Sequence, residues 1–130
     1  MEFPYLYRKN QLYPIIPIKV GKGKLILKTE ALLDSGANIS VFSADIADYF
    51  GIKLTKGRQI YLQGIGGRIV GYIHKLKIIV ADVSFMCPIV FSAELITSFN
   101  IIGRAGFFSK FLIIFNEAKG KLILRPRKIK

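Results

Sequence analysis

Residues 31–37, ALLDSGA, place an aspartate, a serine and a glycine directly after an apolar run. This order predicts that Asp34 lies where a strand ends in a tight turn, with its carboxylate in mostly apolar surroundings. A carboxylate held in this way can serve as an acid or a base. Gly36 lets the backbone turn closely and leaves room beside the carboxylate. The triplet is also typical of an ordinary turn between strands, so other residues must decide whether Asp34 does chemistry.

Other residues that could do chemistry are few. His74 is the one histidine, so no histidine-based triad or metal cluster can be assembled within one chain. Cys87 is the one cysteine and precedes Pro88 in an apolar run, which favours a buried apolar side chain over a nucleophile. We therefore expect no metal and no cofactor.

Length and composition indicate one domain over residues 1–130, with a core at about 13–125 and a basic tail at 126–130. Apolar residues make up 52% of the chain, many of them isoleucine and valine, which favours strands. No apolar run approaches the roughly 18–20 residues of a membrane helix. Residues 1–10 lack the layout of a signal peptide, and a lone cysteine fits a reducing compartment. We expect a cytoplasmic protein without a membrane span.

The charge is strongly positive, because 20 lysines and arginines stand against 8 aspartates and glutamates. A net charge of +12 can attract nucleic acid, an anionic membrane or an acidic protein. Apart from the tail, however, the basic residues are spread along the chain, and no nucleic-acid motif is present. Nucleic acid is therefore not the expected partner, although it remains an alternative.

Strand patterns fill most of the chain, and Ser43 is the expected N-cap of a short helix that ends at Gly51. A second short helix is expected near residue 105. Pro14 and Pro17 confine the start of the first strand to a sheet edge. The predicted fold is all-β and mostly antiparallel, with strands at 13–20, 25–33, 39–42, 57–63, 68–80, 83–91, the start of 98–108, 111–115 and 121–125.

Three glycine-bearing motifs follow one another in a recognisable order: DSGA at 34–37, GIGG at 64–67 and NIIGR at 100–104. Together they resemble the retropepsins, the single-domain aspartic proteases of retroviral type, over roughly residues 13–125. ALLDSGA resembles the catalytic loop, QGIGGRI the flap hairpin, and NIIGRAGFF the segment that braces the catalytic loop. The resemblance implies the retropepsin-like acid protease fold, closed by a flap hairpin.

The resemblance also implies residue roles. Asp34 would be the catalytic aspartate, and Ser35 would hold two paired catalytic loops together. Gly103 and Arg104 would support the site. Substrate would be bound by the catalytic loop, by the flap tip and by pocket walls, which correspond to Gly36, Ala37, Asn38, Val41, Leu62, Gly64, Ile65, Gly66, Gly67, Phe99 and Ile101. Asn38 stands where many viral members carry a second acid, so the usual partner of the arginine is missing or replaced.

A protease of this kind needs two carboxylates, one ionised to activate water and one protonated to polarise the scissile carbonyl. Asp34 is the one aspartate in an Asp-Ser-Gly context. The second carboxylate must then be Asp34 of another chain, related by a two-fold axis. The sequence thus predicts an aspartic endopeptidase that acts on extended peptide as a homodimer. The alternative is an inactive peptide-binding or dimerisation module with the same fold.

Overall fold

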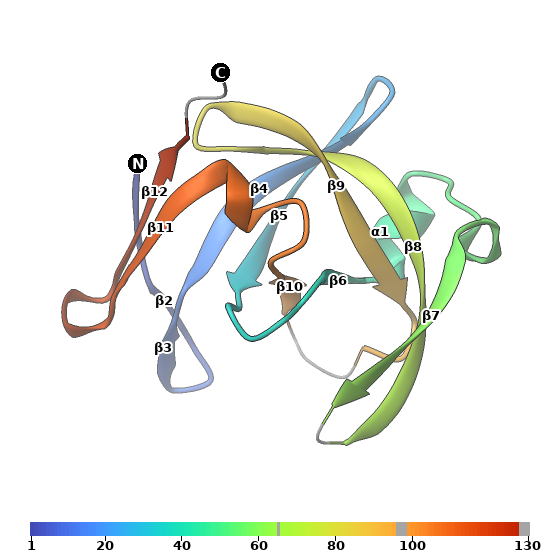
Figure 1. The fold of residues 1–130 in the computed structure, drawn as a ribbon, viewed down its shortest axis with the longest axis horizontal. Coiled ribbons are helices and arrows are strands. Elements are labelled where there is room, and N and C mark those ends of the chain that lie inside the picture. Colours follow the sequence, from blue (N-terminus) through green and yellow to red (C-terminus); the bar gives the residue numbers. More distant parts are fainter. Residues whose placement is uncertain (65, 96–98, 128–130) are drawn as a thin grey trace.

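The structure is a computed structural model of the 130-residue chain, and it describes residues 1–64, 66–95 and 99–127. Most of the described residues lie in strands (Figure 1). In chain order the strands are β1 Glu2–Pro4, β2 Leu6–Arg8, β3 Gln11–Tyr13, β4 Ile15–Lys22, β5 Leu25–Leu33, β6 Ser40–Ser43, β7 Arg58–Gly64, β8 Gly67–Val80, β9 Val83–Ser92, β10 Asn100–Ile102, β11 Phe111–Asn116 and β12 Lys121–Pro126.

Within the described residues, seven strands form one sheet in the order β4-β5-β10-β6-β9-β8-β7. Strand β4 also pairs with β8 at residues 19–21, which closes six of the strands into a ring and leaves β7 outside. The pairs β5–β10 and β6–β9 are parallel, and the other pairs are antiparallel. The prediction of a mostly antiparallel β fold is confirmed.

The core takes one face of this ring and extends to Phe3 of β1 and to Leu122 and Leu124 of β12. On β4, Ile16, Ile18 and Val20 are buried, whereas Pro17 and Lys19 between them are exposed. This alternation is the pattern of a strand with one face in the core. Pro17 lies where β4 pairs with β5 alone, as expected for a residue that cannot donate to a ladder on both sides.

The helix α1, Ala44–Tyr49, follows β6 directly. Ser43 is its N-cap, and the Ser43 Oγ accepts a hydrogen bond from the Asp45 backbone N–H at 3.2 Å. The expected cap is therefore confirmed. The second expected helix is instead one turn of 3-10 helix, η2 Phe108–Lys110, because an extended strand begins at Phe111. The other described 3-10 turns are η1 Leu54–Lys56 and η3 Glu117–Lys119.

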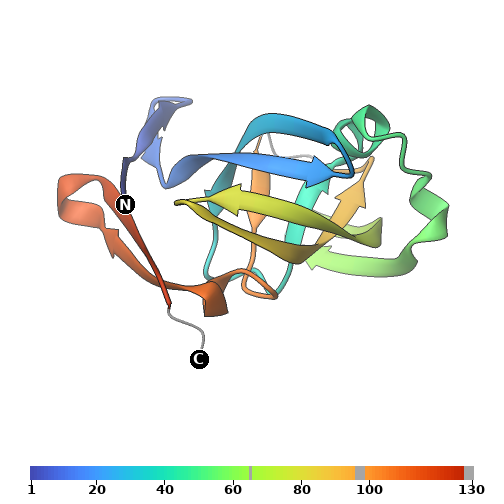
Figure 2. The same ribbon diagram turned by 90° about the horizontal axis from the view of Figure 1, so that it is seen from above.

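The two ends of the chain form a separate three-stranded sheet in the order β1-β12-β11. The Met1 amino group donates a hydrogen bond to the Leu124 carbonyl at 2.7 Å, and the Leu124 N–H donates to the Met1 carbonyl at 2.9 Å. Figure 2 shows this sheet at one end of the molecule, with α1 and the β7–β8 hairpin at the other. The hairpin β11–β12 was expected from the sequence, whereas the pairing of β1 with β12 was not.

A small hairpin, β2–β3, connects the terminal sheet to the main sheet. Its two turn residues, Lys9 and Asn10, have φ angles of 48° and 65°. Two successive residues with positive φ are typical of the tight turns whose twist matches that of the strands. In Figure 1 this hairpin, the loop from β5 to β6 and the tip of the β7–β8 hairpin lie on the same, lower side of the molecule.

Candidate active site

Asp34 directly follows β5, in the tight turn that the sequence predicts. Its backbone N–H donates to the Ile102 carbonyl at 3.0 Å, which continues the pairing of β5 with β10. Its carbonyl accepts from the Ala37 N–H at 3.1 Å, and its Oδ1 accepts from the Gly36 N–H at 2.9 Å. The carboxylate is therefore fixed by its own turn and is half-buried at the end of the strand.

Gly103 makes the close approach of β10 to this loop possible. A Cβ atom on Gly103 would lie 2.5 Å from the carbonyl carbon and oxygen of Ile39. Real Cβ atoms do not approach backbone so closely, so only glycine fits here. The Gly103 N–H donates to the hydroxyl of Ser40 at 3.1 Å, and Ser40 is 1% exposed. Sequence reasoning found Gly103 and missed Ser40, which carries no signal in an apolar strand.

Arg104 holds the other side of the loop. Its backbone N–H donates to the Ala37 carbonyl at 2.9 Å, and the Ala105 N–H donates to the Asn38 carbonyl at 2.8 Å. The Arg104 Nη2 donates to the Asn38 Oδ1 at 3.0 Å. At the position where the resemblance implies an acidic partner, the amide oxygen of Asn38 accepts the hydrogen bond of the arginine.

Asn100 is a second residue that sequence reasoning missed. Its Oδ1 accepts from the Ser43 N–H at 3.0 Å, and its Nδ2 donates to the Glu30 carbonyl at 3.2 Å and to the Thr29 Oγ1 at 3.3 Å. One side chain thus ties β5 to the end of β6. Its partners are far apart along the chain, so nothing local in the sequence could indicate this role.

An open apolar face leads to Asp34. Leu32 is the register partner of Ile101, and Ile101 is the partner of Val41. Partners in register point to the same side of a sheet. Leu32 and Ile101 are half-buried, whereas the next residues, Leu33 and Ile102, face the core and are 3% and 1% exposed. Val41 is 8% exposed and adds little surface.

Asp34 follows Leu32 by two residues, just past the end of β5, and Phe99 precedes Ile101 by two, just before β10. We call Leu32, Ile101 and Phe99 the apolar wall. Val41 and Ile101, two of the residues predicted as pocket walls, lie in one row, and Phe99 continues the wall. Leu62, the fourth, lies apart on β7, which pairs with β8 alone in the described part of the sheet.

The predicted flap corresponds to the tip of the β7–β8 hairpin. Gly64 and Gly67 are register partners at the ends of the two strands, and Gly67 has a φ of 110°. Near the tip the Arg68 guanidinium lies 4.4 Å from the centre of the Tyr61 ring. Ile65 lies outside the described residues. Figure 1 shows that the tip extends beyond the β5–β6 loop on the same side of the molecule.

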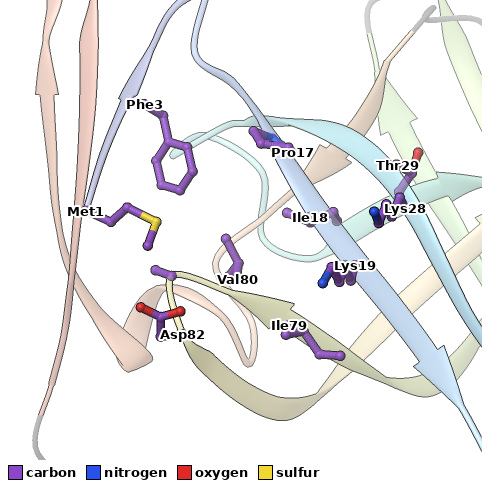
Figure 3. A pocket seen from close by; sticks show the side chains of 11 residues that line it. Met1, Phe3, Pro17, Ile18, Lys19, Lys28, Thr29, Ile79, Val80 and Asp82 are labelled. Carbon is purple, nitrogen blue, oxygen red and sulfur yellow. The ribbon is translucent and has the colours of Figure 1, made fainter.

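Two hollows on the described surface lie away from Asp34, which lines neither. Figure 3 shows the first, of about 420 Å³, where Met1 and Phe3 lie across from Pro17 of β4 and Val80 of β8. The second, of about 430 Å³, is rich in basic side chains and is lined by Lys22, Gly51, Ile52, Lys53, Lys56, His74, Lys75 and Leu76. Neither hollow therefore accounts for the surroundings of Asp34.

Cys87 is 1% exposed and belongs to the core, as the sequence indicates. Burial raises the pKa of its thiol to about 11, while a hydrogen bond with Ser40 and the charge of Lys110 act in the opposite direction. At neutral pH this thiol is protonated, and a protonated thiol is a poor nucleophile.

Comparisons with known proteins agree with this geometry. The family model described as aspartyl protease matches residues 16–103. A solved structure of EIAV protease in complex with the inhibitor HBY-793 is similar at a TM-score of 0.57 and 17% identity, over 76% of this chain and 88% of that chain. At this identity the likeness shows the fold, which is all-β and retropepsin-like. No curated protein is similar enough to count as a match.

In the part of the chain that the structure describes, no helix is long and apolar enough to cross a membrane. The region matched by the family model contains Asp34, its turn and Gly103, which directly follows β10 and contacts the loop after Asp34. It covers residues 16–103 of 130, and the fold agrees with it independently. The chain therefore belongs to the aspartyl protease family.

Proposed function

We propose that this protein is an aspartic endopeptidase that works as a homodimer, with one Asp34 carboxylate from each subunit. The observation that carries the proposal is the placement of Asp34. Its carboxylate is fixed by the Gly36 N–H at 2.9 Å at the end of an open apolar wall. Family membership and the retropepsin-like fold support protease activity in general.

The need for a second subunit follows from the chemistry. One carboxylate must take a proton from water while another, protonated, polarises the scissile carbonyl. The other aspartates of this chain, Asp45, Asp48 and Asp82, are exposed, on α1 and on the β8–β9 turn. None lies in a turn like that of Asp34. A two-fold axis beside the β5–β6 loop would bring two copies of Asp34 together.

The peptide would bind along the open face in an extended form. The Gly36 carbonyl would accept a hydrogen bond from its main chain, as in the addition of a strand to a sheet, and Ala37 and Asn38 would line the cleft. The tip of the β7–β8 hairpin would close over it, and its glycines impose no side-chain bulk there. Closure would exclude bulk water and keep the water that attacks. Ser35, exposed beside Asp34, would bond the loop of the partner subunit.

A non-catalytic peptide-binding module with the same fold is the second candidate. It would use the apolar wall and the hairpin but would not need the Asp34 carboxylate. The intact Asp-Ser-Gly turn favours the enzyme.

The test compares the wild type with Asp34→Asn on a degenerate peptide library at several acidic and neutral pH values. The substitution keeps the shape of the side chain and removes its ability to ionise. We expect cleavage by the wild type and a loss of at least about 1,000-fold with Asp34→Asn, since a group central to the chemical step is removed.

Asp82→Asn is the matched control, because Asp82 is also an aspartate in a turn but is exposed at the β8–β9 turn. It should retain wild-type cleavage. Equal, negligible cleavage by wild type and Asp34→Asn would reject the enzyme and leave the binding module.

A further inference from the structure

The β2–β3 hairpin, which the family match does not include, packs against the apolar wall. The rings of Tyr13 and Phe99 lie with centroids 5.1 Å apart and tilted by 52°. At the hairpin turn, the Lys9 Nζ lies 6.0 Å from the centroid of the same Phe99 ring. The wall that leads to Asp34 therefore ends in an aromatic pair with a lysine above it.

The structure holds this hairpin in place by bonds at both ends. The Pro14 carbonyl, just after β3, accepts from the Leu33 N–H at 3.0 Å. The Arg8 Nη2 pairs with the Glu30 carboxylate at 3.0 Å and the Arg8 Nη1 donates to the Tyr7 carbonyl at 2.9 Å. The turn that presents Lys9 is thus anchored to β5, the strand that Asp34 directly follows.

Arg8 and Lys9 are neighbouring basic residues of this hairpin, but only the charge of Arg8 is paired with a described carboxylate. Glu30 neutralises the charge of Arg8. In the part of the chain that the structure describes, that contact is the one ion pair found, so no described carboxylate pairs with Lys9. Its ammonium stands exposed over the Phe99 ring, without an ion pair to any described carboxylate.

Other groups around the open face add to this positive field. Arg104 lies on the Asn38 side of the loop, and Arg68 lies over Tyr61 on the β7–β8 hairpin. The Glu94 carboxylate accepts a hydrogen bond from the Val70 N–H at 2.7 Å. With a net charge of +12, the whole molecule favours the approach of an anionic ligand.

We infer that Lys9 and the Tyr13–Phe99 pair form a subsite for an acidic substrate side chain, so that peptides with aspartate or glutamate at one position near the scissile bond are preferred. This inference rests on the proposed function. The methylene groups of the acidic side chain would contact the aromatic rings, and its carboxylate would pair with the Lys9 ammonium. The site is partly exposed, so the pair contributes selectivity more than affinity.

The test is a charge reversal. Peptide libraries are prepared in which each position flanking the cut is fixed as glutamate or as lysine, and cleavage is measured at low salt. The wild type should cleave the glutamate peptides about 5-fold faster or more at one position. Lys9→Glu should abolish or reverse that preference at the same position, with cleavage of neutral peptides retained.

Lys24→Glu is the matched control, since it makes the same charge change in the β4–β5 turn on the opposite side of the molecule in Figure 1. It should keep the wild-type preference. Lys9→Asn removes the charge with a residue that adopts positive φ readily, so it tests the inference even if Lys9→Glu folds poorly. An unchanged preference in both Lys9 variants overturns the inference.

A binding measurement separates this inference from the proposed function. The inactive variant Asp34→Asn is titrated with labelled glutamate and lysine peptides, with and without Lys9→Glu. Cleavage without charge preference would overturn the subsite and leave the protease. Absent cleavage together with binding of glutamate peptides that depends on Lys9 would support the subsite and overturn the protease. Equal binding of both peptides counts against the subsite.

Discussion

At the scale of single residues, the contact of Asn38 with Arg104 orients the loop that follows Asp34. The Asn38 side-chain oxygen takes the hydrogen bond from Arg104 that an acid would otherwise accept, at 3.0 Å. A neutral amide lacks the attraction between a carboxylate and the guanidinium, but its oxygen still accepts the hydrogen bond. The loop is also bonded through its backbone to Arg104 and Ala105, so the arginine orients the loop with little dependence on a second carboxylate.

Removing the Asn38 side chain should loosen the loop. Asn38→Ala should lower the free energy of unfolding by about 1 kcal/mol, because one hydrogen bond to a charged donor is lost. Asn38→Asp should change it by less than about 1 kcal/mol, since an exposed ion pair adds little. Urea unfolding measures both, and a double-mutant cycle with Arg104→Ala isolates the pair. Zero coupling in that cycle would contradict the role assigned to the contact.

The thiol of Cys87 should be inert in the folded protein. Its pKa of about 11 leaves about one thiolate in a thousand at pH 8. We expect alkylation by iodoacetamide at pH 8 to be far slower in the native state than in guanidinium chloride. Equal rates in the two states would show that the thiol is accessible.

The same pKa has a consequence for stability. The unfolded thiol loses its proton near its ordinary pKa of 9.0, whereas the folded thiol keeps it up to about pH 11. The contribution of Cys87 to stability is therefore complete below pH 9 and is lost as the pH rises from 9 to 11. Cys87→Ala should show a shallower alkaline loss of unfolding free energy than the wild type.

At the scale of elements, the site depends on the contact between β10 and the loop that follows Asp34. Gly103→Ala would force a Cβ against the Ile39 backbone at 2.5 Å. We expect the free energy of unfolding to fall by about 3 kcal/mol or more, because backbone must move. Gly21→Ala in β4 is the control, since its nearest contact would be an ordinary 3.6 Å. Similar urea midpoints for the two variants would contradict this packing.

Elements with local signals could be predicted from the sequence. The strand at 25–33, the Ser43 cap and the closing hairpin were found, since each is encoded by its own residues. Strands β1 to β3 were missed because three-residue strands have no readable period, and β1 pairs with a strand at the other end of the chain. Ser40 was missed for a similar reason, since its partner Gly103 lies 63 residues away.

The residues of the site also divide into those with a local sequence signal and those that depend on distant parts of the chain. Asp34 and Gly103 could be predicted because their roles require a particular residue type in a short motif. The contact of Lys9 and Tyr13 with Phe99 could not, because it depends on where a separate hairpin comes to rest. A third group, the residues of the β7–β8 tip, was predicted only as a motif, and their role remains a prediction.

At the scale of the whole molecule, an active dimer should show a bell-shaped dependence of kcat/KM on pH, on the acid side of neutrality. Two adjacent carboxylates share one proton, and activity needs the form with one proton bound. Initial rates on one peptide across acidic to alkaline buffers measure the profile. A flat profile would contradict a carboxylate pair.

The terminal strands bear on how two subunits can meet. Because β1 pairs with β12 of its own chain, the ends need not be exchanged between subunits for the fold to form. The open face around Asp34, with the apolar wall on one side and the β7–β8 hairpin on the other, is then the surface expected to face the partner. An interface at that face would place one carboxylate of each subunit at the axis.

Mixing subunits tests this arrangement directly. Wild type and Asp34→Asn are mixed in equal amounts under conditions that allow exchange, and activity is compared with wild type at the same total concentration. Sites built from two subunits leave about a quarter of the activity, since only dimers with two aspartates work. A site complete within one chain leaves about half. Asp82→Asn in place of Asp34→Asn should leave activity unchanged, so retention of half the activity with Asp34→Asn would reject the shared site.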